Sequence, residues 1–141
     1  MQAIIHIVGT QKVDDQTDTI ELTTDGTLEK TTDGWKICYE ESEATGMVGT
    51  ATTVHITDGK ITLERTGTNA SFLVLEKHRR HHSNYNTPYG AIDLGTYATE
   101  LRHNLSPNGG ELFFAYTLGF NGSVNSEHTV HITIREDKSH V

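Results

Sequence analysis

The stretch ELFFAYTLGF, residues 111–120, places an apolar side chain at every second position: Leu112, Phe114, Tyr116, Leu118 and Phe120. A period of two is typical of a β-strand with one buried face. The pair Asn121-Gly122 follows, and Asn-Gly favours the positive backbone dihedrals of a two-residue hairpin turn. Alternation resumes beyond it, so we predict an antiparallel hairpin whose second strand carries Val130, Ile132 and Ile134.

The same two signals recur along the rest of the chain. Further turn-forming pairs are Asp25-Gly26, Asp33-Gly34, Asp58-Gly59 and Asn108-Gly109. Between them lie alternating runs such as Trp35, Ile37 and Tyr39, and we find no convincing amphipathic helix. The sequence therefore predicts strands near residues 2–11, 17–24, 27–32, 34–41, 48–57, 60–67, 70–78, 89–104, 111–121 and 127–136.

Eight to ten strands joined mainly by short hairpins form a meander. A meander of that length removes its exposed edges best by closing on itself. The chain of 141 residues is close to the usual size of one domain. We therefore predict an all-β fold in which residues 1–141 form a single antiparallel up-and-down β-barrel, whose interior is either filled by side chains or just wide enough for one small ligand.

Charge and cysteine content exclude several classes of partner. The net charge of −8 is repelled by the phosphate backbone of nucleic acids, so we expect no nucleic-acid partner. The single Cys38 cannot form an intrachain disulfide, which fits a reducing compartment. The apolar run from Ala3 to Val8 is too short for a signal-peptide core or a membrane span, so we expect a cytoplasmic protein without a membrane partner.

Sequence motifs of catalytic or cofactor sites are missing. The chain has no phosphate-binding loop, dinucleotide fingerprint, nucleophile elbow or His-Glu-x-x-His motif, so we expect no cofactor, and enzymatic activity stays open. The histidine-rich stretch from His78 to His82 includes Arg79 and Arg80, whose charges oppose a metal ion. We predict a solvated loop and no metal site there, with anion binding by the two arginines as the alternative.

Arg65 is the most informative charged residue, because it continues the alternation of Ile61 and Leu63 along one predicted strand and should point to the same side as they do. A charge directed toward an apolar interior needs a partner. Three interpretations are open: Arg65 extends to the rim of the barrel, pairs with an internal carboxylate such as Glu76, or holds the carboxylate of a ligand.

Aromatic side chains complete the candidate ligand site. Trp35, Tyr39 and Tyr116 are expected to point inward, either as ordinary core or as the wall of a cavity. The segment from Tyr85 to Gly90 combines a proline with a glycine at a strand entry, and there Tyr89 is expected at the mouth of the barrel. The candidate ligand-binding residues are therefore Trp35, Tyr39, Arg65, Tyr89 and Tyr116.

Several short motifs resemble one bacterial family. These are Trp35–Glu41, Gly49–Thr53 followed by Val54, Arg65–Gly67, Thr87–Gly90, and Gly109-Gly110 before the aromatic strand with Tyr116. They resemble the YwiB-like family of unknown function. The resemblance covers most of the chain and implies a calycin-like, that is lipocalin-like, β-barrel and a cytoplasmic setting. It implies no catalytic residue, and the His78–His82 stretch is not part of its pattern.

Three functional hypotheses follow. The first is a small barrel that binds an apolar or amphipathic molecule inside or at its mouth, with Arg65 as the anchor for an anionic group; this rests partly on fold analogy. The second is an enzyme that uses Arg65, a tyrosine hydroxyl and a His or Glu in that cavity. The third is a filled barrel that acts as a structural or interaction protein, as a monomer or a homodimer.

Overall fold

The computed structural model describes residues 1–41, 49–67, 71–87, 90–120 and 123–138. Within these ranges, no helix is long and apolar enough to cross a membrane. The structure consists of ten β-strands: β1 (Gln2–Val13), β2 (Gln16–Lys30), β3 (Gly34–Glu40), β4 (Thr50–Thr57), β5 (Lys60–Gly67), β6 (Ser71–Glu76), β7 (Arg80–Thr87), β8 (Gly90–Ser106), β9 (Gly109–Phe120) and β10 (Ser123–Glu136).

All ten strands belong to one sheet, in the order β6-β5-β4-β3-β2-β1-β10-β9-β8-β7. Strands that follow one another in the chain pair antiparallel, except β6 and β7, and β1 also pairs with β10, so the first and last strands are neighbours. The two ends of the sheet are β6 and β7, which are consecutive in the chain. This is the strand order of an up-and-down barrel and confirms the predicted all-β fold.

The seam between β6 and β7 is bridged at one end, so the barrel is nearly closed. The backbone N–H of His78 donates to the carbonyl oxygen of Ala98 on β8 at 2.8 Å. The hydroxyl of Thr96, also on β8, donates to the carbonyl oxygen of Val74 on β6 at 2.7 Å. A β-bridge between Glu76 and Arg79 adds to these contacts.

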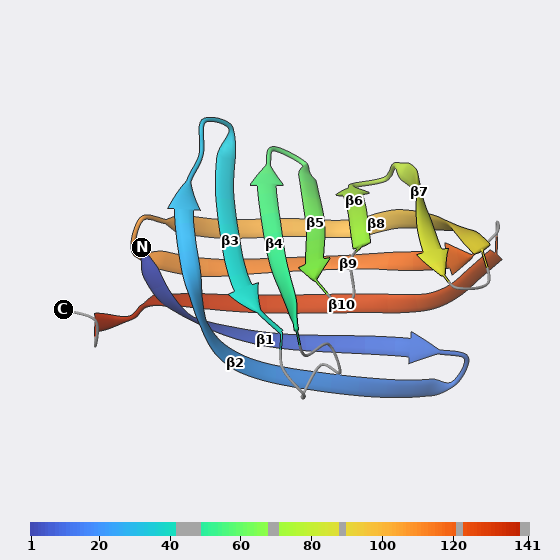
Figure 1. Ribbon diagram of the computed structural model, residues 1–141, viewed down its shortest axis with the longest axis horizontal. Coiled ribbons are helices and arrows are strands. Elements are labelled where there is room, and N and C mark those ends of the chain that lie inside the picture. Colours follow the sequence, from blue (N-terminus) through green and yellow to red (C-terminus); the bar gives the residue numbers. More distant parts are fainter. Residues whose placement is uncertain (42–48, 68–70, 88–89, 121–122, 139–141) are drawn as a thin grey trace.

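The barrel is flattened into two layers that cross one another. Figure 1 shows the short strands β3 to β6 crossing the long strands β1, β8, β9 and β10, while β2 bends from the long layer into the short one. Gly26 lies at this bend, where β2 exchanges its pairing with β1 for pairing with β3. A Cβ atom at Gly26 would collide with the carbonyl oxygen of Cys38 and with the side chain of Ile5, so the close approach requires glycine.

Two local predictions are wrong. Asp25-Gly26 is not a hairpin turn, because β2 continues through it from Gln16 to Lys30 and joins two predicted strands into one. The polar stretch after Arg80 is a strand and not a loop, because β7 pairs with β8 from Arg80 to Thr87. The predicted hairpin of β9 and β10 is confirmed, with Phe114 opposite Val130, although its turn at residues 121–122 lies outside the described residues.

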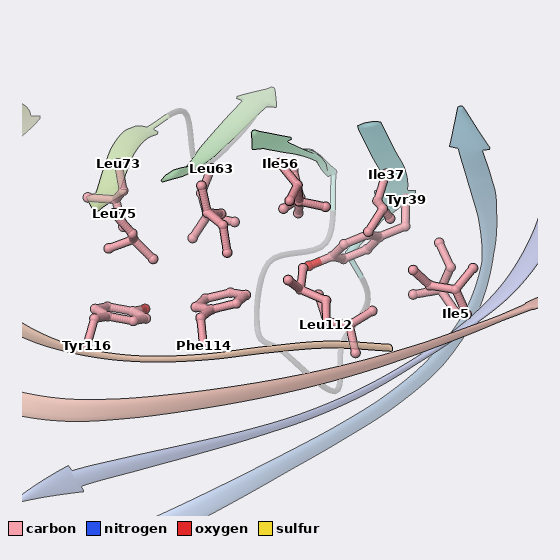
Figure 2. Packing of buried hydrophobic residues seen from close by; sticks show 14 of the residues in the cluster. Ile5, Ile37, Tyr39, Ile56, Leu63, Leu73, Leu75, Leu112, Phe114 and Tyr116 are labelled. Atoms are coloured by element: carbon pink, nitrogen blue, oxygen red, sulfur yellow. The ribbon is translucent and has the colours of Figure 1, made fainter. Parts of the chain in front are cut away.

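The apolar side chains of alternate positions meet between the two layers. Figure 2 shows Ile37, Ile56, Leu63 and Leu75 from the short strands facing Leu112, Phe114 and Tyr116 from β9. Phe114 and Leu112 are almost completely buried. Leu63, Phe114 and Tyr116 of this core also line a cavity.

Candidate functional site

A cavity of about 340 Å³ lies inside one end of the barrel, next to the hairpin of β1 and β2. Its mouth is bordered by Gln11, Asp18 and Ile20, which are exposed. The wall is mostly apolar and is contributed by both layers: Ile7, Leu22, Leu63, Leu73, Phe114, Leu118, Val130 and Ile132. Polar side chains also line it, among them Tyr39, Glu41, Arg65, Tyr116 and His128.

Arg65 enters this cavity because β5 alternates Ile61, Leu63 and Arg65 on its inner face. The Nε atom of Arg65 lies 4.0 Å from Oε1 of Glu41, which is an ion pair but too long for a hydrogen bond. Nε is buried and finds no hydrogen-bond partner among the residues that the structure describes. The side chain as a whole keeps 22% of its surface exposed, so the guanidinium is only partly enclosed.

Glu41 continues the inward alternation of Ile37 and Tyr39 by one step, because its N–H donates to the carbonyl oxygen of Thr50 and prolongs the pairing of β3 with β4. Its side chain is only 2% exposed. The hydroxyl of Thr52 donates to Glu41 Oε1 at 2.7 Å. Burial raises the pKa of Tyr39, and the adjacent Glu41 charge raises it further, so the Tyr39 hydroxyl keeps its proton.

On the opposite layer, Tyr116 of β9 and His128 of β10 are directly paired across the two strands. Their rings stack, with centroids 4.8 Å apart and planes inclined by 7°. Ser126 Oγ lies 2.7 Å from His128 Nε2. Burial lowers the pKa of His128, and the positive charge of Arg65 lowers it further, so the imidazole is neutral at pH 7. Burial also raises the pKa of Tyr116.

Three of the five predicted site residues, Tyr39, Arg65 and Tyr116, meet in this cavity. Trp35 does not line it; it packs half-buried against the core, with Lys30 Nζ 5.1 Å from its ring centroid. Tyr89 lies outside the described residues.

Arg65 does have an internal carboxylate partner, but that partner is Glu41 and not Glu76. Glu41 was not predicted from the sequence as a site residue. Its position in the alternation that includes Ile37 and Tyr39 predicts an inward side chain. The same argument applies to His128, which lies two residues before Val130 on β10 and so faces the same side of the sheet.

The histidine-rich stretch lies at the seam, away from the cavity. His81 Nε2 donates to Glu76 Oε1 at 2.9 Å, and this hydrogen bond holds the pKa of Glu76 below its usual value. His82 Nδ1 lies 3.4 Å from an oxygen of Asp93. Within the described ranges, no three His, Cys, Asp or Glu side chains converge so that they could hold a metal ion.

Comparisons with known proteins identify the fold but no activity. A family profile described as a domain of unknown function, DUF1934, matches residues 5–132. The crystal structure of the YwiB protein from Bacillus subtilis superposes with a TM-score of 0.85, covering 97% of this chain and 92% of that one at 18% sequence identity. No curated protein matches the chain.

Proposed function

The chain belongs to the DUF1934 family, which has no assigned function, and we propose from the cavity that the protein binds a small amphipathic carboxylate. Arg65 holds the charged group of this ligand. The family membership agrees with the resemblance to YwiB-like proteins. The observation that carries this proposal is the buried Nε of Arg65, which has no acceptor within the described part of the chain although it faces Glu41. A buried donor without a partner costs roughly 1–3 kcal/mol, so a ligand oxygen that accepts from it relieves that cost.

Glu41 does not satisfy the guanidinium. Its Oε1 atom accepts a hydrogen bond from Thr52. The same atom lies 4.0 Å from Arg65 Nε, which is too far for a hydrogen bond. A guanidinium carries five N–H donors arranged for bidentate binding of a carboxylate. Arg65 therefore keeps donors available for a second carboxylate.

The remainder of the cavity suits an aliphatic tail. Leu22, Leu73, Leu118 and Ile132 line it from four different strands. Its volume of 340 Å³ is near the lower end of small-molecule sites, which span about 300–1,000 Å³. At ~30 Å³ for each water-sized group, the cavity holds on the order of ten heavy atoms. A medium-chain carboxylic acid combines this size with the required anionic group.

Native mass spectrometry of gently purified protein, beside a denatured control, tests whether a ligand is retained. Calorimetric titration with the saturated carboxylates from hexanoate to dodecanoate then measures affinity. Arg65→Met should raise the Kd at least tenfold, since a hydrogen bond to a charged group contributes roughly 1.5–3 kcal/mol. Arg102→Met, at an exposed arginine outside the cavity, is the matched control. Equal affinity for decanol and decanoate in the wild-type protein would contradict the proposal.

Acid–base catalysis in the same cavity is the second candidate, and the position of His128 favours it. A neutral imidazole that lines a cavity together with Arg65 has the properties of a general base beside an anion-binding group. Turnover of p-nitrophenyl decanoate that disappears in His128→Gln would favour this candidate. Binding of decanoate without any such turnover would favour simple binding.

A further inference from the structure

The charges inside the cavity determine what must accompany a bound carboxylate. Resting on the proposed function, we propose that the protein takes up one proton with each carboxylate that it binds, and that His128 accepts this proton. The cavity of the free protein is close to neutral, because the charges of Arg65 and Glu41 oppose one another at 4.0 Å. A bound carboxylate adds one negative charge to a largely apolar enclosure, where an uncompensated charge is costly.

Most of the other titratable groups that line the cavity are not suited to take up this proton. A proton on Glu41 would remove its ion pair with Arg65 at 4.0 Å and weaken the hydrogen bond that it accepts from Thr52 at 2.7 Å. Asp18, on β2, is exposed at the mouth and lies outside the apolar part of the cavity. The hydroxyls of Tyr39 and Tyr116 already carry protons.

His128 can accept a proton without losing a contact. Its Nε2 lies 2.7 Å from Ser126 Oγ, and a serine hydroxyl either donates to a neutral imidazole or accepts from a protonated one. The ring of Tyr116 stacks on the imidazole at 4.8 Å, and an aromatic face attracts a cation. In the described cavity, protonation of His128 is therefore opposed by burial and by the positive charge of Arg65.

A ligand carboxylate on Arg65 offsets the part of this opposition that comes from the guanidinium. It neutralises the guanidinium that repels the second cation and supplies a negative charge to the protonated imidazole. Binding and protonation consequently favour one another by the same factor, as linkage requires. The cavity is then selective for weak acids over neutral amphiphiles, and affinity increases as the pH falls.

Decanoate binding measured by calorimetry at pH 7, in phosphate and in Tris, tests the proposal, because the two buffers release different heats on ionisation. Uptake approaching one proton per decanoate is expected. The Kd should rise up to tenfold for each unit of pH between the pKa values of His128 in the free and the bound protein. His128→Gln should abolish both effects, whereas His103→Gln, an exposed histidine on β8, should keep them.

A second variant tests the charge-balance argument separately. Glu41→Gln leaves Arg65 unopposed in the free cavity, so a carboxylate restores neutrality without a proton. This variant should bind decanoate with no proton uptake, and at pH 8 more tightly than the wild-type protein does.

Each other result has a defined meaning. Decanoate binding without proton uptake in the wild-type protein would overturn the coupling and leave the proposed function intact. Uptake that persists in His128→Gln would overturn the assignment to His128. Failure of every carboxylate from hexanoate to dodecanoate to bind would overturn the proposed function and this inference together.

Discussion

The ion pair of Arg65 and Glu41 should behave as a coupled unit in stability measurements. Three variants isolate it: Glu41→Gln, Arg65→Met and the double variant. Each single substitution leaves the other charge inside the barrel without its partner, and the double substitution removes both charges. Because Glu41 is only 2% exposed and Arg65 is 22% exposed, water compensates the stranded arginine better than the stranded carboxylate.

The magnitudes follow from the geometry. Removing one partner of a buried ion pair costs about 3–5 kcal/mol. Arg65→Met strands the more deeply buried of the two charges, but the hydrogen bond that Thr52 still donates to Glu41 offsets this and keeps the cost at the low end. It also removes the unsatisfied Nε, which returns about 1 kcal/mol and leaves a net loss of about 2 kcal/mol. Glu41→Gln weakens the charged hydrogen bond from Thr52 and should also cost about 2 kcal/mol.

The double variant should lose only about 1 kcal/mol, because two uncharged side chains leave no stranded charge. The coupling energy is then about 3 kcal/mol, below the Coulomb energy of about 4 kcal/mol for charges 4 Å apart at an effective dielectric constant of 20. Urea unfolding at pH 7 measures all four proteins, with fluorescence of Trp35, the single tryptophan, as the probe. Losses that add within about 0.5 kcal/mol would refute the coupling.

Three other perturbations test separate parts of the structure. Gly26→Ala should lose about 1–3 kcal/mol in thermal unfolding because its methyl group meets the Cys38 carbonyl, whereas Gly9→Ala has room and should lose nothing. Glu76→Gln should lower the melting temperature at pH 7, and the difference should vanish as the pH falls below about 4, because the folded protein holds the Glu76 pKa below its unfolded value. The wild-type protein should lose stability as the pH falls below about 6.5, because unfolded His128 binds a proton more readily than folded His128. His128→Gln should flatten that loss in urea titrations.

The fold could be predicted from sequence wherever one face of a strand is buried. Alternation predicted β9 and β10, because a slip of one residue would expose Phe114 and Val130, but it did not predict the bulge between Val124 and Ser126 that sets their register. The strand β7 could not be found this way, since its sequence RHHSNYNT has no apolar period. It is a strand because β8 offers it a row of backbone partners from Tyr97 to Gly90. Asp25-Gly26 misled for a different reason: glycine there serves a close packing contact and not a turn.

The sequence predicted that the Arg65 side chain points into the barrel, but not which carboxylate it pairs with. Parity placed Arg65 inside the barrel, and the structure places it there. Its partner Glu41 is distant in sequence, and the two meet because β4 lies between β3 and β5, with Thr52 opposite both Tyr39 and Arg65. The contact between Glu41 and Arg65 depends on the register of all three strands. The sequence around Glu41 alone therefore does not predict it.

The adjacency of the first and last strands has a consequence for synthesis on the ribosome. β10 pairs along its length with β1 on one side and with β9 on the other. Until residues 123–136 have left the exit tunnel, the long edges of β1 and β9 both remain without their partner. Such open edges recruit strands from other chains. The nascent chain is therefore most vulnerable to aggregation just before its final strand emerges, and that strand closes both edges in one step.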